Sequence, residues 1–189
     1  MMAPKVIGIV GPQGSGKTEV AKTISELGVP CVRMGDLVWD EVKRRGQEVT
    51  EENVARVAGE LRERLGQGAV AKLCIPLIKR VGKDKPAVVV DGIRSEAEVK
   101  EFRRMFHGDF YLIAVQCGEK IRYSRIASRR RADDANTMEK FVMKDQREES
   151  WGLEGAMKSA DFTIVNEGTL EELRERAVEV YKKVVGEHV

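Results

Sequence analysis

The stretch Gly11-Pro12-Gln13-Gly14-Ser15-Gly16-Lys17-Thr18 decides the fold of this 189-residue chain. Its spacing is G-x-x-x-x-G-K-[ST]: the glycines let backbone N–H groups surround an anion, and the next helix points its positive end at the same place. An apolar run over 6–10 precedes the stretch and a helical pattern over 17–27 follows it. This strand–turn–helix context predicts a phosphate-binding loop. The pattern differs from the G-x-G-x-x-G of dinucleotide folds, which excludes hydride chemistry.

The loop residues predict contacts with a nucleoside triphosphate. Lys17 is expected to reach the β- and γ-phosphates, and the Thr18 hydroxyl to ligate Mg²⁺. We expect the nucleotide to be bound by the loop and the start of the helix, through Gly11, Gln13, Gly14, Ser15, Gly16, Lys17, Thr18 and Glu19. ATP and Mg²⁺ are therefore the predicted cofactors.

Length and composition exclude several classes of protein. With 33 Lys+Arg against 31 Asp+Glu, the chain lacks the one-sided basicity of a duplex-DNA binder. No apolar run approaches the roughly 18 residues of a membrane helix, and the first residues lead into a strand without a signal-peptide core. The three cysteines are too widely spaced for a disulfide framework or a zinc site. We expect one soluble cytoplasmic domain over 1–189.

Four further apolar segments alternate with helical patterns. They cover 29–33, 87–90, 110–115 and 162–165. This alternation predicts a five-stranded parallel sheet with helices on both faces, the three-layer α/β/α architecture of P-loop NTPases. Two helices are expected to begin with capping boxes, Ser95 with Glu98 and Thr169 with Glu172.

The interval 37–82 contains no convincing strand. It predicts three helices, over 37–45, 51–65 and 69–81. We interpret the interval as a helical insertion on one side of the sheet, with the core formed by 1–36 and 83–189.

Two aspartates follow predicted strands. Asp91 comes after 87–90, at the carboxyl end of a strand beside the loop, where we expect it in the Mg²⁺ shell with Thr18. An Asp-Gly turn that ends the strand is the structural alternative. Asp36 comes after 29–33 and is expected either to serve the acceptor site or to cap the helix over 37–45.

A group of arginines follows the fourth predicted strand. Arg122, Arg125 and Arg129 share one helical face, and Arg131 comes directly afterwards. Such a run is usually a solvated face, which is the interpretation that we give to Arg122. Because a transferring γ-phosphoryl group needs cations around it, we assign that role to Arg125, Arg129 and Arg131.

Together these motifs resemble P-loop proteins of the nucleoside-monophosphate-kinase type, related to adenylate kinase, UMP/CMP kinase and dephospho-CoA kinase. More closely, the chain resembles a group of adenylate-kinase-related, dephospho-CoA-kinase-like ATPases. The resemblance runs from Lys5 to about Val185. Besides the phosphate loop, it rests on Gly35-Asp36-Leu37, Asp91-Gly92-Ile93-Arg94, and the segments 125–134 and 160–173.

The resemblance implies roles for residues outside the loop. Arg94 would grip the acceptor phosphate, Arg125 and Arg129 would clamp the γ-phosphoryl group, and Arg131 and Asp133 would belong to a short lid over about 129–137. The backbone around Asn166 and Glu167 would line the donor adenine, and the insertion over 37–82 would bind the acceptor.

Two differences from the pattern of these kinases concern the identity of the acceptor. Trp39 stands where adenylate kinases have an arginine that binds the acceptor phosphate, and Asp91-Gly92-Ile93-Arg94 is one residue shorter than the D-G-F-P-R of these kinases. A dephospho-CoA-kinase alignment instead makes Asp36 a candidate general base. A ribose hydroxyl must lose a proton, whereas the phosphate of a nucleoside monophosphate (NMP) is already an anion at pH 7. An NMP and dephospho-CoA both stay open as acceptors.

The sequence thus predicts a kinase that transfers the γ-phosphoryl group of Mg·ATP to a nucleotide-like small molecule. The alternative is an ATPase that acts as a switch or assembly factor with a protein or RNA partner. The basic segments Lys43-Arg44-Arg45 and Arg129-Arg130-Arg131 could contact RNA, but they lack interleaved aromatic residues for base stacking.

Overall fold

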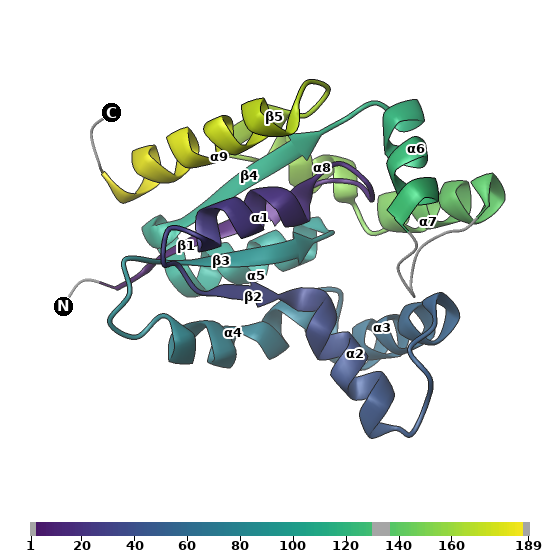
Figure 1. The fold of residues 1–189 in the computed structure, drawn as a ribbon. Helices are drawn as coiled ribbons and strands as arrows, with labels where there is room; N and C mark the ends of the chain where they lie inside the picture. The colour runs from purple at the N-terminus through teal and green to yellow at the C-terminus, as the bar shows by residue number, and fades with distance from the viewer. Residues whose placement is uncertain (1–2, 130–136, 187–189) are drawn as a thin grey trace.

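The computed structural model describes residues 3–129 and 137–186, with Arg129 described only by its backbone. Its centre is a five-stranded sheet of order β2-β3-β1-β4-β5 in which all neighbouring strands are parallel (Figure 1). The strands are β1 Lys5–Val10, β2 Cys31–Arg33, β3 Ala87–Ile93, β4 Phe110–Gln116 and β5 Phe162–Val165. The predicted parallel sheet and P-loop NTPase fold class are confirmed.

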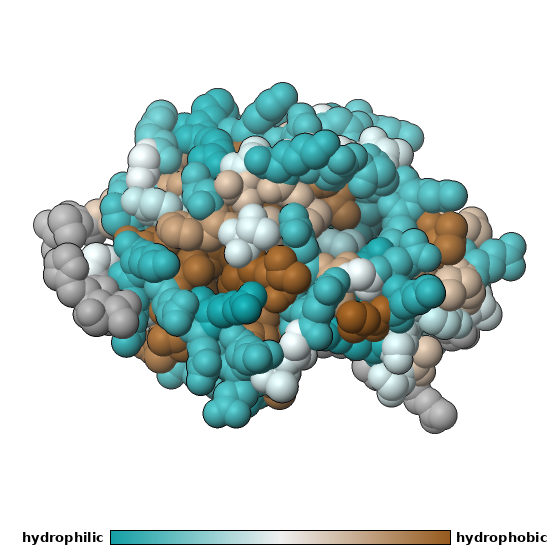
Figure 2. All heavy atoms as spheres, turned by 90° about the horizontal axis from the view of Figure 1, so that it is seen from above, coloured by the Kyte–Doolittle hydropathy of each residue, from teal (hydrophilic) through white to brown (hydrophobic). Residues whose placement is uncertain are grey.

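Helices connect the strands and cover both faces of the sheet (Figure 1). They are α1 Lys17–Ser25, α2 Met34–Arg44, α3 Glu51–Leu65, α4 Ala69–Val81, α5 Glu96–Phe106, α6 Glu119–Arg129, α7 Met138–Ser150, α8 Leu153–Lys158 and α9 Leu170–Val185, with a 3₁₀ turn over His107–Asp109. Figure 2 shows one face of the molecule, where polar side chains form most of the outline and apolar ones are visible nearer the middle. Among the described residues, none of the helices is long and apolar enough to cross a bilayer.

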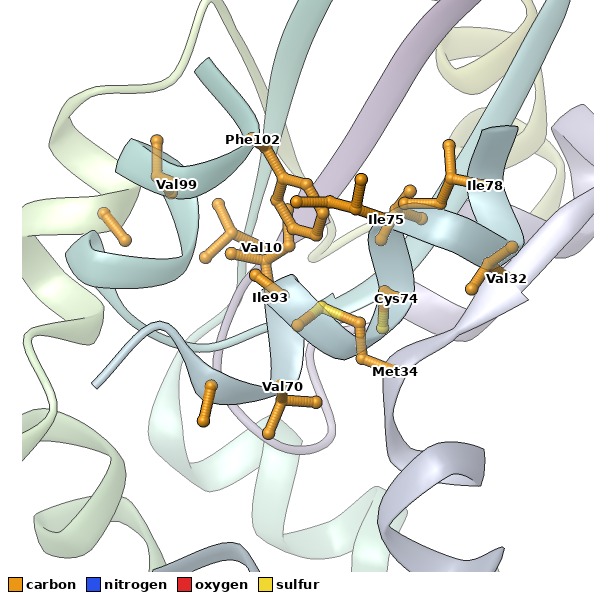
Figure 3. Packing of buried hydrophobic residues seen from close by; sticks show 14 of the residues in the cluster. Val10, Val32, Met34, Val70, Cys74, Ile75, Ile78, Ile93, Val99 and Phe102 are labelled. Carbon is orange, nitrogen blue, oxygen red and sulfur yellow. The ribbon is translucent and has the colours of Figure 1, made fainter. Parts of the chain in front are cut away.

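Each face of the sheet has its own apolar core. On one face, Ile7 and Ile9 of β1 pack with α1 and α9. On the other, Val6 and Val10 pack with α4, α5 and α8, and Figure 3 shows Phe102 of α5 within this core. Because successive strand side chains point to opposite faces, β1 contributes to both cores. The result is three layers, with the phosphate loop at the carboxyl end of β1.

The helices α2, α3 and α4 occupy the region predicted as an insertion. The bounds of α3 and α4 agree with the prediction, but α2 begins at Met34, before the predicted start at residue 37. Asp36 therefore lies in the first turn of α2, where a carboxylate is favoured by the helix dipole, and the predicted role of Asp36 as an N-cap is wrong. In α4, the fully buried Cys74 and Ile78 belong to the core of the sheet (Figure 3).

Strand β3 continues past the residue where the sequence indicated its end. Ile9 pairs with Asp91 and Val10 pairs with Ile93, so Gly92 forms a bulge. Its φ of 99° is a backbone conformation that residues other than glycine rarely adopt. An Asp-Gly turn that ends the strand is therefore wrong. The bulge leaves Asp91 at the edge of the sheet where β1 enters the phosphate loop.

The two predicted capping boxes have different outcomes. Thr169 and Glu172 form both reciprocal bonds at the start of α9. At α5, the Ser95 hydroxyl accepts from the Glu98 N–H at 3.2 Å, but the Glu98 carboxylate accepts from the Arg94 N–H at 2.8 Å instead of completing the box. The second box is therefore only half formed. The other oxygen of the Glu98 carboxylate pairs with the guanidinium of buried Arg62, with a distance of 3.4 Å between Oε1 and Nη2.

Candidate nucleotide and acceptor site

The phosphate loop depends on glycines with left-handed backbones. Gly14 has a φ of 73° and Gly16 a φ of 104°. A Cβ atom at Gly14 would lie 2.7 Å from the Arg122 carbonyl oxygen, and one at Gly16 would lie 2.3 Å from the Asn166 Nδ2 atom. Glycine is therefore required both for the turn and for close packing against α6 and the end of β5.

Lys17 and Thr18 begin α1 beside the third strand. The Thr18 Oγ1 atom donates to Asp91 Oδ2 at 3.2 Å, and the Lys17 ammonium donates to the Pro12 carbonyl at 2.8 Å. Burial is the main cause that lowers the pKa of Lys17 to about 7, and nearby Arg94 acts in the same direction. A phosphate in the loop would oppose this effect, because an adjacent anion favours the charged ammonium.

The oxygen atoms of Thr18 and Asp91 suit Mg²⁺, a hard cation that binds one or two protein oxygens together with phosphates and water. In the parts of the chain that the structure describes, no group of three or more His, Cys, Asp or Glu residues could hold a metal ion. The hydroxyl of Thr18 and the carboxylate of Asp91 fit an ion that is shared with a bound nucleotide.

Helices α6 and α7 support the loop from outside. The Gln13 side chain donates to the Phe141 carbonyl at 2.8 Å and to Asp145 at 2.9 Å. Arg122 forms an ion pair with Asp145 at 2.7 Å and donates to the Gln13 carbonyl at 3.2 Å. Arg122 is buried, so its assignment to a solvated face is wrong. Its burial follows from packing against α7, which no local pattern encodes.

The end of β5 supports the loop from a second side. Asn166 Nδ2 donates to the Ser15 carbonyl at 2.8 Å, and Arg125 donates to the carbonyls of Asn166 at 3.2 Å and Gly14 at 3.4 Å. Arg125 thus binds the loop backbone, and its action on a γ-phosphoryl group stays a prediction. Glu19 pairs with Arg174 of α9 at 2.7 Å.

A hollow at the carboxyl edge of the sheet brings most of the predicted residues together. Those that line it are Gln13, Gly14, Gly16, Lys17, Thr18, Glu19, Asp36, Asp91, Arg94 and Arg125. Gly11 and Ser15 are buried within the loop, and Asn166 and Glu167 line a separate hollow at the β5–α9 turn. The Arg129 side chain, Arg131, Asp133 and the predicted lid as far as residue 136 lie outside the described residues.

A second cavity continues from this hollow between α2, α3 and α7. The two spaces share Gly35, Trp39, Gly92, Arg94 and Lys144. Apolar side chains of α2 and α3 form much of the wall, and both tryptophans of the chain, Trp39 and Trp151, line it. A molecule in this cavity would therefore reach the phosphate loop at one end.

Three ion pairs join different elements around the second cavity. Arg94 pairs with Glu148 of α7, Arg147 of α7 pairs with Glu51 of α3 at 2.5 Å, and Arg62 of α3 pairs with Glu98 of α5 at 3.4 Å. Burial raises the pKa of Glu98 and lowers that of Arg62. Arg94, predicted to grip an acceptor phosphate, is thus bound to a carboxylate in this structure.

The sequence interpretation missed the contribution of α7. Lys144 and Glu148 are buried and line the second cavity, and Arg147 lies between them on the helix. The spacing i, i+3 and i+4 places these side chains on one face of α7, which is the one signal that the sequence contains. The charged surface of an ordinary amphipathic helix has the same spacing, so the pattern does not distinguish the two.

The sheet order and the phosphate loop define the α/β fold of a P-loop NTPase. The solved structures that it resembles include TT1252 from Thermus thermophilus (22% identity, TM-score 0.68, 96% of this chain and 98% of that one). They also include shikimate kinase from Acinetobacter baumannii in complex with shikimate, at 18% identity and a TM-score of 0.65, with 98% of this chain and 96% of that one covered. Dephospho-CoA kinase from Campylobacter jejuni has 14% identity and a TM-score of 0.53, with 97% of this chain and 98% of that one covered. At these sequence identities, the similarity shows a shared fold and nothing more.

Sequence relatives identify the family. A family model described as an AAA domain matches residues 7–151. A UPF0200 protein of Thermococcus onnurineus is 39% identical, with 97% of this chain and 100% of that protein covered. The UPF0200/UPF0201 protein of Archaeoglobus fulgidus is 47% identical over 95% of this chain, which spans 56% of that longer protein. The chain belongs to the UPF0200 family.

Proposed function

We propose that the chain is a phosphotransferase that moves the γ-phosphoryl group of Mg·ATP to a nucleotide-like small molecule, with an NMP and dephospho-CoA as the candidate acceptors. The observation that carries this proposal is the continuity of the loop hollow with the cavity between α2, α3 and α7, through Arg94 and Lys144. An enzyme that only hydrolyses ATP needs no second cavity at that place.

The proposed mechanism is in-line transfer by positioning and charge stabilisation. The loop N–H groups and Lys17 would bind the β- and γ-phosphates, and Thr18 and Asp91 would bind Mg²⁺, which offsets charge on the phosphates. Lys144 and Arg125 line the hollow as further cations near the transferring group. The acceptor would approach from the second cavity, on the side away from ADP.

The test is turnover with a panel of acceptors. Wild-type protein with Mg·ATP is expected to phosphorylate one of AMP, CMP, UMP and dephospho-CoA, and that acceptor should suppress futile ATP hydrolysis. Lys17→Ala should lose turnover by at least about a hundredfold, because the loop lysine contacts the transferring phosphates directly. Normal transfer by this variant would contradict the mechanism.

A second candidate is an ATPase with a protein partner. The Archaeoglobus relative favours it, since its name joins UPF0200 with UPF0201 and its length exceeds that of this chain. Steady ATP hydrolysis that no acceptor suppresses, and that a UPF0201 protein alters, would support this candidate over the phosphotransferase.

A further inference from the structure

The cavity between α2, α3 and α7 contains a carboxylate with an unused oxygen. The Glu148 side chain is 1% exposed, and its Oε1 atom accepts from the Arg94 guanidinium. Its Oε2 atom is buried and has no hydrogen-bond partner among the described residues. A buried acceptor that lacks a hydrogen-bond partner destabilises the protein, so this position favours a ligand that donates a hydrogen bond.

Glu148 lines the cavity that opens onto the proposed place of phosphoryl transfer. It lines the second cavity together with Gly92, Arg94 and Lys144, which also line the hollow over the phosphate loop. Its negative charge acts to raise the pKa of Lys17, against the lowering by burial. The carboxylate is therefore within electrostatic reach of the lysine that would bind the β- and γ-phosphates.

The wall of the cavity at Glu148 is poorly suited to a phosphate as the attacking group, whereas buried nitrogens of Arg62 and Arg147 without hydrogen-bond partners among the described residues suit other, anionic parts of an acceptor. Trp39 lines the cavity near Arg94 with a mostly apolar side chain, and Arg94 already pairs with Glu148. A phosphate dianion would compete with that carboxylate for Arg94 and would face its unpaired oxygen. A neutral hydroxyl would instead donate to this oxygen and leave the ion pair intact.

Asp36 is placed differently. It lines the hollow over the loop but not the second cavity, and its side chain is 51% exposed at 3.9 Å from Arg33. A half-exposed carboxylate at this position binds water readily, whereas Glu148 is closed off from solvent. Between the two carboxylates, Glu148 is the one that a molecule inside the cavity would contact.

We propose that the acceptor is an alcohol, such as a ribose or polyol hydroxyl, and that Glu148 binds this hydroxyl and takes up its proton. The proposal rests on the phosphotransferase function. The hydroxyl oxygen forms a bond with Pγ while the bond between Pγ and the β–γ bridging oxygen breaks, so that ADP leaves with the bridging oxygen. The hydroxyl proton passes to Glu148 and then to solvent. Of the two candidate acceptors, this chemistry selects dephospho-CoA over an NMP.

The linkage in the product tests the proposal without any variant. Wild-type protein is incubated with Mg·ATP and, separately, AMP, CMP, UMP, dephospho-CoA, shikimate or gluconate, and the product is examined by ³¹P NMR. A phosphomonoester, without phosphorus–phosphorus coupling in the new group, is expected. A diphosphate formed from an NMP would overturn the alcohol proposal while supporting the phosphotransferase. If no acceptor is phosphorylated, the phosphotransferase assignment itself fails.

The role of Glu148 is tested by Glu148→Gln against Glu149→Gln, its exposed neighbour on α7. With the acceptor found above, Glu148→Gln is expected to lower kcat by about a hundredfold or more and to remove the acidic limb of the pH–rate profile. Affinity for ADP should be unchanged, which shows that the variant is folded, and Glu149→Gln should behave as wild type. An unchanged pH profile, or the same loss in Asp36→Asn alone, would overturn the assignment. If Glu148→Gln does not fold, the product linkage decides.

Discussion

Lys17 shows how a single residue links burial to ligand binding. Its ammonium donates to the Pro12 carbonyl, and burial holds its pKa at about 7, against an ordinary value of 10.5. Phosphate charges at the loop would raise that pKa again, because they stabilise the protonated form. With this pKa, Lys17 is only partly charged at neutral pH in the free protein, and bound ATP would keep it fully charged.

This difference predicts that ATP binding takes up a proton above pH 7. Because the pKa rises on binding, affinity is greatest below pH 7 and falls by up to about tenfold per pH unit above it. Calorimetry of ATP binding at pH 8, in two buffers of different ionisation enthalpy, should show uptake approaching one proton, and little from Lys17 at pH 6. Lys17→Met should remove the uptake at pH 8; equal uptake in this variant would contradict the assignment.

At the scale of elements, α7 has two functions. Through Asp145 it binds Arg122 of α6 and Gln13 of the phosphate loop, and through Glu148 it binds Arg94 beside the second cavity. The same helix thus holds the loop in place and forms one wall of the second cavity. A change in the position of α7 would therefore alter both the phosphate loop and the second cavity.

Removing the contact of α7 with the loop is expected to weaken both stability and ATP binding. Asp145→Ala leaves buried Arg122 without its carboxylate, which costs roughly 3–5 kcal/mol for a fully buried pair and less here, because Asp145 is 23% exposed. Urea denaturation and ADP titration measure the two effects. Glu154→Ala, which removes the exposed partner of Lys158, is the control and should leave the denaturation midpoint unchanged. Equal midpoints for both variants would show that the pair does not support the fold.

At the scale of the whole molecule, the second cavity is formed where two parts of the chain meet. The helices α2 and α3 form one side and α7 forms the other, and the pair of Glu51 with Arg147 joins them at 2.5 Å. Both side chains are about one-third exposed, so the pair contributes modestly to stability. Because Glu51 and Arg147 line the second cavity, we expect the pair to affect the KM for the proposed acceptor more than the KM for ATP.

Glu51→Ala is therefore expected to raise the KM for the acceptor by about fivefold, the equivalent of roughly 1 kcal/mol, with little change in the KM for ATP. Steady-state kinetics with each substrate varied in turn measure the difference, and Glu52→Ala, at an exposed neighbouring position, serves as the control. A rise confined to the KM for ATP would show that α3 acts on the donor side.

Local sequence predicted the geometry around the phosphate loop well. The spacing from Gly11 to Thr18 and the apolar run before it predict a loop between a buried strand and a helix, and Asp91 was expected beside Thr18, where it lies. These inferences succeed because each depends on neighbours within a few residues, or on the rule that parallel strands end at the same edge. The bounds of α3 and α4 were predictable for the same reason.

Tertiary structure alone decided which charged groups pair and which lie buried. Arg94 was expected to hold a phosphate and instead pairs with Glu148, and Arg122 was expected in solvent and instead lies beneath α7. The partners are far apart in the chain, and a buried charge takes whichever opposite charge packing brings near it, because leaving it unpaired is costly. By itself, the sequence therefore determined the P-loop fold and the position of the phosphate loop. The second cavity, with Glu148 in its wall, is formed only where α2, α3 and α7 meet.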